Sequence, residues 1–234
     1  MAPIPSTSLA RAAVRSAVAL VLPTTCAGCG VLGESWCSDC RRAVARTPPR
    51  GHRRGVPSWS ATAFDGPVRA AVTAYKDRGR RDLLHVLAPL LAASVAAALT
   101  EDPALRRART SGGPVLLVPV PASARAVRRR GDDPVAALAG RVAALVDDPS
   151  VEVAPVLRHV RPVTDQSRLS RPARAANLAG ATRVDPRWVR RVDQAACVLL
   201  DDVVTTGATL DEAARALRSA GARYVVAATV AATP

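Results

Sequence analysis

The sequence predicts an α/β protein in which a doubly wound parallel sheet follows a small zinc-ribbon segment at the N-terminus. Three observations support this prediction. Helix-like and strand-like segments alternate over most of the 234 residues. Four cysteines are crowded between Cys26 and Cys40. An apolar strand near the C-terminus runs directly into a turn rich in acids, hydroxyls and glycine, which is typical of ligand sites in open α/β sheets.

The composition is that of a folded, cationic protein. The chain has 33 basic and 19 acidic residues, a net charge of +14, and 49% hydrophobic residues, which excludes wholesale disorder. No uninterrupted apolar run reaches the length of about 18 residues that a membrane span needs, so we expect none. The charge favours anionic partners, either phosphorylated small molecules or nucleic acid. Aromatic residues make up only 3%, which leaves few rings on which bases could stack.

One basic residue differs from all the others, because Lys76 is the only lysine among the 33. Arginine-rich codon usage accounts for most of this imbalance. A compact ammonium, however, cannot be replaced everywhere by a planar guanidinium. Lys76 is therefore a candidate functional residue.

The chain is predicted to have three regions. Residues 1–45 hold an N-terminal helix and the cysteine cluster, residues 46–58 form a linker rich in Pro, Gly and Arg, and residues 59–234 form the α/β domain. Residues 1–22 carry a short apolar run that could be a weak secretory signal or part of an amphipathic helix. The shortness of the run and the lack of a clear cleavage site favour the helix, and with it a cytoplasmic protein.

The hydrophobic pattern of the α/β domain alternates between helical and extended segments. Helices are predicted where apolar residues recur with a helical period, and strands where short apolar runs are bounded by turn residues. In chain order we expect a helix over Pro67–Leu99, a strand over Val115–Val120, a helix over Val135–Val146, a strand over Cys197–Leu200, a helix over Leu210–Ala220 and a strand over Tyr224–Val230. Strands that alternate with helices predict a parallel sheet.

The cysteines form two C-x2-C pairs, Cys26 with Cys29 and Cys37 with Cys40, separated by seven residues. Two such turns supply four thiolates for a tetrahedral, structural zinc ion with no open coordination position. The alternatives are two disulfides or reduced thiols. The odd fifth cysteine, Cys197, fits poorly with a disulfide-bonded secreted protein. It lies in an apolar run and is predicted to be a core residue rather than a nucleophile.

The turn after the strand at Cys197 has the most specific pattern, Asp201-Asp202-Val-Val-Thr-Thr-Gly207-Ala-Thr209. Gly207 allows several backbone N–H groups to converge at a helix N-terminus, where they and the threonine hydroxyls suit a phosphate. The adjacent acids would repel that phosphate, but they can accept hydrogen bonds from the vicinal diol of a ribose. Thr209 followed by Glu212 also fits a capping box. An ordinary strand-to-helix turn is the alternative.

Two polar segments are candidates to surround this turn. Arg125, Arg128, Arg129 and Arg130 follow a strand that stops at two prolines, and arginine binds phosphate oxygens in pairs. Alternatively these arginines form a solvated helix face. The segment from residue 158 to residue 177 is polar with little periodicity, which predicts a mobile flap. We expect His159 within it to be an exposed side chain rather than a general base.

The diol acceptors beside a phosphate cradle closely resemble the motif with which type I phosphoribosyltransferases bind phosphoribosyl pyrophosphate (PRPP). From about Leu22 onward, the chain is similar to the ComF family, competence-associated proteins of this fold. The residues that carry this similarity are the Leu22-Pro-x-x-Cys26-x-x-Cys29-Gly30 segment, Tyr75-Lys76-Asp-Arg78-Gly79-Arg80, Pro119-Val-Pro121 with Arg130-Gly131, and Arg161, Gln166, Arg174, Asn177 and Gly180.

The resemblance implies a type I phosphoribosyltransferase-like fold that binds PRPP together with Mg²⁺ and carries one structural zinc. It implies that Asp201 and Asp202 are catalytic and hold the ribose and Mg²⁺-linked hydroxyls. Arg161, Gln166, Arg174 and Asn177 would belong to a flexible loop. The implied PRPP-binding residues are Asp201, Asp202, Val203, Val204, Thr205, Thr206, Gly207, Ala208, Thr209, Lys76 and Arg130.

Two features depart from the family pattern. Asp132-Asp133-Pro134 stands where members usually have an aromatic residue, Asn and Gln, which puts Arg128 and Arg130 in question as direct pyrophosphate ligands. The further cysteine pair of some members is missing, which limits the chain to one zinc ion.

Two functions from different classes follow from these patterns. The first is an enzyme that transfers ribose 5-phosphate from PRPP to an acceptor and releases pyrophosphate, in DNA uptake or nucleotide metabolism. The second is a non-catalytic, PRPP-sensing protein that binds single-stranded DNA or proteins of the competence machinery. The net charge favours nucleic-acid binding, whereas the scarcity of aromatic residues counts against a stacking mode.

Overall fold

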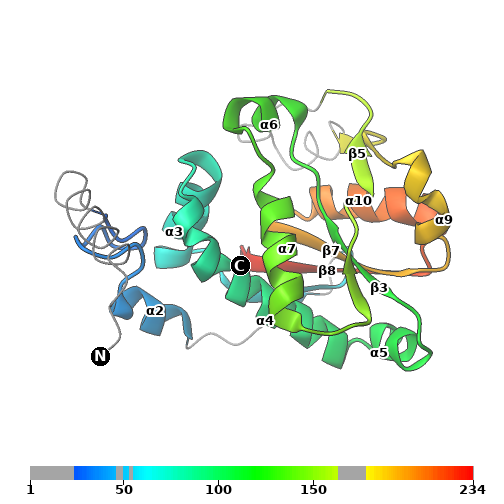
Figure 1. Cartoon of the computed structure of the whole chain (residues 1–234), viewed down its shortest axis with the longest axis horizontal. Helices are drawn as coiled ribbons and strands as arrows, with labels where there is room; N and C mark the ends of the chain where they lie inside the picture. The colour runs from blue at the N-terminus through cyan, green and yellow to red at the C-terminus, as the bar shows by residue number, and fades with distance from the viewer. Residues whose placement is uncertain (1–23, 46–49, 53–54, 163–177, 234) are drawn as a thin grey trace, which may run out of the picture.

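A six-stranded sheet forms the centre of the protein (Figure 1). The computed structural model describes residues 24–45, 50–52, 55–162 and 178–233. In spatial order the strands are β1 (Arg50–His52), β2 (Ser58–Ala63), β8 (Tyr224–Ala232), β7 (Ala196–Val204), β3 (Val115–Pro119) and β4 (Val151–Val153). All neighbouring pairs from β2 to β4 are parallel, and only β1 is antiparallel to its neighbour. The predicted parallel sheet is confirmed.

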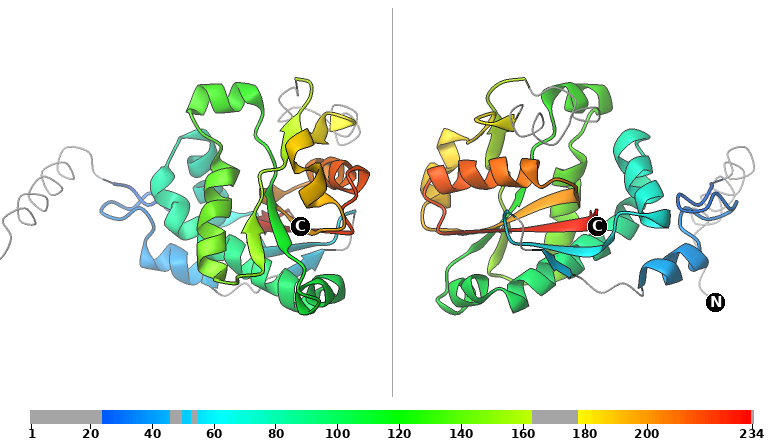
Figure 2. Two further views of the ribbon diagram at one scale, coloured as in Figure 1. Left: turned by 45° about the vertical axis from the view of Figure 1, so that its right-hand side comes forward. Right: turned by 180° about the vertical axis from the view of Figure 1, so that it is seen from behind.

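Helices cover both faces of the sheet, so the fold is doubly wound (Figure 2). Side chains of β7 alternate between the two cores: Val198 and Leu200 pack in one, Cys197 and Leu199 in the other. The first core also contains residues of α2 (Ser38–Ala45), α3 (Gly66–Asp77), α4 (Leu84–Glu101), α5 (Pro103–Thr110) and α7 (Pro134–Val146). The second contains residues of α9 (Val189–Val192), α10 (Ala208–Ser219) and the hairpin of β5 (Leu157–His159) with β6 (Thr182–Val184).

The single helix predicted over Pro67–Leu99 is wrong, because the chain breaks it after Asp77. Gly79 adopts φ +67°, a left-handed conformation that an α-helix cannot contain, and a short 3-10 turn over Arg81–Leu83 leads into α4. The apolar faces of α3 and α4 contact the same core. The hydrophobic pattern therefore continues across the break and does not reveal it.

The other elements predicted within the α/β domain are present with small changes in their bounds, whereas the N-terminal helix predicted in residues 1–22 lies outside the described residues. The largest change is in β7, which extends to Val204 and so includes the acid pair. Within the predicted linker, β1 adds an edge strand to the sheet. Helix α4 is long and apolar enough to cross a membrane by composition, but half of its most apolar window is buried. It contacts β2, β8 and α7, so it is a core helix.

The strand order reverses direction between β3 and β7. From β3 the chain passes through α6 (Ala124–Arg130) and α7 to β4 on one side, whereas from β7 it passes through α10 to β8 on the other. In open α/β sheets, ligands bind outside the carboxyl ends of the strands at such a point. Here these ends are joined by a hydrogen bond of 2.9 Å from the Val120 N–H to the Leu200 carbonyl.

Candidate functional site

The acid pair and the phosphate loop lie at the carboxyl end of β7. Asp201 and Asp202 belong to the final part of the strand, and only three residues separate its end at Val204 from the start of α10 at Ala208. Gly207 adopts φ +81° and is the N-cap of α10. The Ala208 N–H lies 3.4 Å from the Thr206 hydroxyl. The first N–H groups of α10 have no acceptor within the helix, so this end of it is suited to an anion.

Glu212 does not form the predicted capping box, because the helix starts before Thr209 and its N-cap is Gly207. The Glu212 side chain is buried instead and accepts a hydrogen bond of 3.0 Å from the Thr182 N–H. Arg215 donates to both Glu212 oxygens at 2.8 Å and to the Thr182 carbonyl at 2.9 Å. This cluster ties α10 to β6, and the i, i+3 spacing of the acid and the arginine is its only signal in the sequence.

The two aspartates lie in different surroundings, because successive residues of a strand point to opposite faces of the sheet. Asp202 is on the α3 face, is 3% exposed, and pairs with Lys76. The Lys76 Nζ lies 3.1 Å from Oδ1 and 2.9 Å from Oδ2 of Asp202. Asp201 is half-buried, and its Oδ1 accepts a hydrogen bond of 2.9 Å from the Asp202 N–H. The partner of Lys76 in the structure is therefore the second acid.

These surroundings shift the pKa values of Asp201 and Lys76. Burial and the negative charge of Asp202 raise the pKa of Asp201 to about 7, against the opposing influence of Lys76. For Lys76, burial favours the neutral amine, but the attraction of Asp202 and Asp201 outweighs it and raises the pKa. The ammonium of Lys76 is consequently retained at neutral pH, whereas Asp201 titrates near neutrality.

Helix α6 places one of the predicted arginines beside this pair. Arg130 Nη1 donates to the Lys76 carbonyl at 3.2 Å. Its Nε is buried and has no hydrogen-bond partner in the described part of the chain. Buried guanidinium nitrogens normally have an acceptor, so Arg130 is suited to an anionic ligand. Arg128 is exposed, and the side chains of Arg125 and Arg129 lie outside the described residues.

The Asp132-Asp133-Pro134 segment has partners of its own. Arg81 Nε donates to Asp132 at 2.6 Å, and the Arg81 guanidinium lies 5.0 Å from the centroid of the Tyr75 ring. Asp133 is the N-cap of α7 and accepts hydrogen bonds from the first N–H groups of that helix. Because both carboxylates are satisfied in this way, the departure from the family pattern does not conflict with an anion site at Arg130.

Of the segment predicted as a flap, residues 158–177, the structure describes only residues 158–162, and β5 at its start pairs antiparallel with β6. His159, predicted to be exposed, is half-buried, and its Nε2 lies 3.0 Å from the carbonyl oxygen of Pro121, two residues after the end of β3. Arg161 is exposed and donates to the Ala179 carbonyl at 2.8 Å. The other predicted loop residues, Gln166, Arg174 and Asn177, lie outside the described residues.

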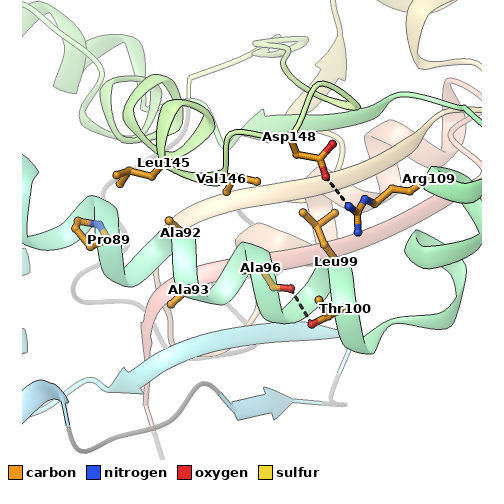
Figure 3. A pocket seen from close by; sticks show the side chains of 10 residues that line it. All are labelled: Pro89, Ala92, Ala93, Ala96, Leu99, Thr100, Arg109, Leu145, Val146 and Asp148. Atoms are coloured by element: carbon orange, nitrogen blue, oxygen red, sulfur yellow. Dashed lines mark hydrogen bonds and ion pairs between the residues drawn. The ribbon is translucent and has the colours of Figure 1, made fainter.

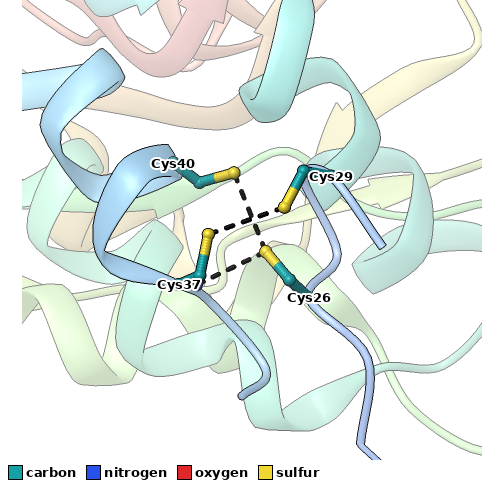
Figure 4. A group of neighbouring side chains, drawn as sticks. All are labelled: Cys26, Cys29, Cys37 and Cys40. Atoms are coloured by element: carbon teal, nitrogen blue, oxygen red, sulfur yellow. Dashed lines mark hydrogen bonds between the residues drawn. The ribbon is translucent and has the colours of Figure 1, made fainter. Parts of the chain in front are cut away.

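The four clustered cysteines converge on one point (Figure 4). Their Sγ atoms all lie within 4.8 Å of one another, with 3.7 Å between Cys26 and Cys40 and 3.6 Å between Cys29 and Cys37. Tetrahedral zinc with bonds of about 2.3 Å separates its sulfurs by about 3.8 Å, whereas a disulfide needs about 2.05 Å. Although burial opposes ionisation, backbone N–H donors hold the pKa of Cys26 below its usual value. The cluster thus fits a structural zinc site.

The four-cysteine segment (the ribbon) packs directly on α3, the helix that carries Lys76. A Cβ at Gly28 would lie 2.6 Å from the Cys40 Sγ and 2.9 Å from the Pro67 Cβ, so no side chain fits there. Trp36 of the ribbon is buried in the core that α3 also contacts. The fifth cysteine, Cys197, is fully buried, and burial raises the pKa of its thiol to about 12, which agrees with the predicted core role.

A separate groove of about 500 Å³ lies between α4 and the C-terminal end of α7 (Figure 3). Its lining is mostly apolar, and its charged residues, Arg109 and Asp148, are paired with each other at 2.6 Å. It contains none of the predicted site residues. The predicted acid pair lies instead at the carboxyl end of β7, outside this groove.

Comparison with protein-family models supports a candidate site at the carboxyl end of β7. Residues 136–234 match the family model described as a phosphoribosyl transferase domain. The match includes the acid pair, the loop around Gly207 and α10, whereas Lys76, Arg130 and the four clustered cysteines lie outside it. Comparison with curated protein sequences gave no significant match. The chain therefore has the predicted α/β fold, in which residues 136–234 are similar to a phosphoribosyl transferase domain and a four-cysteine cluster lies near the N-terminus.

The zinc site gives a first prediction. We expect one zinc ion per purified chain, and we expect Cys26→Ser to lose the metal together with part of the stability, because a segment this small cannot hold a core alone. Metal analysis by mass spectrometry and thermal unfolding measure the two effects. Cys197→Ala is the control, since it also removes a buried thiol but should retain the zinc. Full zinc content in Cys26→Ser would contradict the assignment.

The raised pKa of Asp201 gives a second prediction. Folding raises it from 3.8 to about 7, so the unfolded chain loses this proton at lower pH than the folded protein. Protonation of Asp201 therefore adds to the free energy of unfolding below about pH 4, and this contribution is lost as the pH rises to about 7. We therefore compare the free energy of unfolding of Asp201→Asn with that of wild type. The difference should shift in favour of the variant by about 1 to 3 kcal/mol from pH 4 to pH 8.

Denaturant titrations at the two pH values, without added Mg²⁺ or PRPP, measure this gain. Asp39→Asn is the control, because Asp39 is exposed on α2 and its substitution should give no pH-dependent gain. A stability difference between Asp201→Asn and wild type that is the same at both pH values would show that Asp201 ionises normally.

Proposed function

We propose that the protein binds PRPP with Mg²⁺ and transfers its ribose 5-phosphate to an acceptor, releasing pyrophosphate. One observation carries this proposal. The acid pair Asp201-Asp202, the left-handed turn at Gly207 and the start of α10 meet at the strand switch point, inside the region that matches the phosphoribosyl transferase domain. A phosphate cradle next to diol acceptors is the arrangement that a phosphorylated ribose requires.

In the proposed complex, the 5′-phosphate accepts hydrogen bonds from the N–H groups and hydroxyls of the loop from Thr205 to Thr209. The ribose hydroxyls donate to the carboxylates of Asp201 and Asp202. Carboxylate and hydroxyl oxygens are ligands that Mg²⁺ prefers, so the residues present fit that ion. When bound, Mg²⁺ supplies positive charge that offsets the pyrophosphate oxygens. Arg130, whose Nε has no acceptor among the described residues, would add to this neutralisation.

The proposed reaction is a displacement at C1 of the ribose. The C1–O bond to pyrophosphate breaks, and its electron pair leaves with pyrophosphate. The acceptor's nucleophilic atom forms the new bond to C1 and gives up a proton. Positive charge develops on the sugar while negative charge develops on the leaving group, so catalysis consists mostly of positioning and charge stabilisation.

The similarity to the ComF family extends the proposal to the biological role. On that basis the transfer would serve DNA uptake or nucleotide metabolism. A cytoplasmic location is part of the same proposal, because a reducing compartment keeps the four thiols available for zinc. The division into a zinc ribbon over residues 1–45, a linker over 46–58 and a phosphoribosyltransferase-like domain over 59–234 is proposed likewise.

Calorimetric titration with PRPP and Mg²⁺ tests the binding step. We expect saturable binding by wild type and a loss of at least about tenfold in affinity for the double variant Asp201→Asn/Asp202→Asn, because charge-assisted hydrogen bonds to the ribose are lost. Asp39→Asn should bind as wild type does. Equal affinity in the double variant and wild type would reject the proposed site. Pyrophosphate release across a panel of purine and pyrimidine bases then separates an enzyme from a PRPP-sensing protein.

One observation favours the second candidate function, a non-catalytic sensor that binds single-stranded DNA. Arg158 and Arg183 lie directly opposite each other on β5 and β6, and both are exposed. Like charges in this position are unfavourable unless an anion lies between them. Asp185, 4.0 Å from Arg158, offsets only part of this charge. The outer face of the hairpin is therefore suited to phosphate groups of a nucleic acid.

Salt dependence of oligonucleotide binding tests this second function. If both arginines contact phosphates, the double variant Arg158→Gln/Arg183→Gln should reduce the slope of log affinity against log salt concentration by about 1.4. Arg106→Gln/Arg107→Gln is a control that removes two exposed charges on α5. Equal reductions in both double variants would indicate attraction by net charge alone, without a site on the hairpin.

A further inference from the structure

Lys76, the only lysine of the chain, forms an ion pair with Asp202, the second acid of the pair. Lys76 lies in the last turn of α3, and this helix lies beside the carboxyl ends of β7 and β8 (Figure 1). Its Nζ is within hydrogen-bond distance of both oxygens of Asp202, at 3.1 and 2.9 Å. The Asp202 side chain is 4% exposed, whereas that of Lys76 is 45% exposed. The carboxylate is thus enclosed, while the ammonium is on a stem that reaches solvent.

The backbone next to this ammonium is held from three other elements. Arg130 of α6 donates to the Lys76 carbonyl at 3.2 Å. Arg81 donates to the Tyr75 carbonyl at 2.8 Å. The buried Tyr75 hydroxyl donates to the Pro134 carbonyl at the start of α7, at 3.0 Å. The end of α3 is therefore anchored at several points, and its position directs the flexible side chain of Lys76 toward Asp202.

This pairing has a consequence for cations. Mg²⁺ binds carboxylate oxygens, and the Lys76 ammonium already donates to Oδ1 of Asp202 and forms an ion pair with its Oδ2. An ammonium and a divalent cation cannot occupy the same oxygens together, because like charges repel. A compact ammonium on a four-carbon stem can leave one anion and reach another, which the bidentate fork of arginine does less readily. This difference gives a physical reason for a lysine in a chain that otherwise uses arginine.

We propose that Lys76 is an exchangeable counter-ion of the PRPP site. It neutralises Asp202 until a divalent cation and PRPP bind, and it then transfers from Asp202 to a phosphate oxygen of the ligand. The transfer to phosphate rests on the proposed function. The competition between Lys76 and the cation does not, because it involves only Asp202 and the metal.

Cation binding alone tests the competition. Titration with Mn²⁺ at pH 8, with free Mn²⁺ measured by electron paramagnetic resonance, should show about tenfold tighter binding by Lys76→Gln than by wild type, because the competing charge is gone. Lys76→Arg keeps the charge and should bind within about threefold of wild type. Arg78→Gln removes an exposed charge two residues along the chain and should not tighten binding. Equal Mn²⁺ affinity in wild type and Lys76→Gln would overturn the proposal.

For PRPP, the affinities of wild type and Lys76→Gln should rank in the opposite order. With Mg²⁺ saturating, we expect Lys76→Gln to bind PRPP at least about fivefold more weakly than wild type, because the phosphate loses a cationic partner. Tighter Mn²⁺ binding with unchanged PRPP affinity would overturn the transfer to phosphate. If wild type binds no PRPP, the proposed function is rejected. The competition between Lys76 and the cation is then still decided by the Mn²⁺ titration.

Acetylation of the wild-type chain provides a test that needs no Lys76 variant. Lys76 carries the only side-chain amine, so mass spectrometry can follow its acetylation against that of the N-terminal amine. We expect slow acetylation of Lys76 in the free protein, severalfold faster acetylation when Mn²⁺ is added, and slow acetylation again with Mn²⁺ and PRPP together. In the Asp202→Asn variant, Lys76 should be acetylated fast even without metal. No change of rate on adding saturating Mn²⁺ would contradict the exchange.

Discussion

Parallel pairing of β7 with β3 on one side and β8 on the other positions every polar group of the candidate site. The chain leaves β3 and β7 toward opposite edges and opposite faces of the sheet, so two strand ends remain uncovered by their own connections. The N-terminus of α10 and the acid pair follow directly from this pairing, because both are continuous with β7. The helix that faces them, α3, comes from a distant part of the sequence and brings Lys76 to the same edge.

At that edge of the sheet, most charged side chains are neutralised by a single nearby partner. Lys76 neutralises Asp202, and Arg81 neutralises Asp132. Asp133 is used to cap α7. These pairings leave Asp201 and Arg130 as the groups whose charge or hydrogen-bonding capacity the described protein does not fully satisfy. A ligand with hydroxyls at one end and phosphates at the other complements both, which is why a phosphorylated ribose suits the site better than a simple anion.

The four-cysteine segment contributes to the site through α3. It is too small for a core of its own, so its buried residues join the core beneath α3, and Gly28 allows the close contact with Pro67. Arg80, just beyond α3, adds a hydrogen bond of 3.2 Å to the Thr25 carbonyl in the ribbon. The ribbon therefore supports the helix that presents Lys76, and it does so from the side away from the sheet (Figure 2).

Features that depend on neighbours in the chain were predictable from the sequence. The alternation of strands and helices, the thiolate spacing and the loop around Gly207 all follow from short-range patterns of residue type. The break at Gly79 and the role of Glu212 were not predictable, since a hydrophobic period crosses the first and a capping pattern mimics the second. The pairing of Lys76 with Asp202 joins residues 126 positions apart. Only the tertiary structure decides such a contact, because the packing of α3 against the end of β7, rather than any local preference, determines which charge each side chain meets.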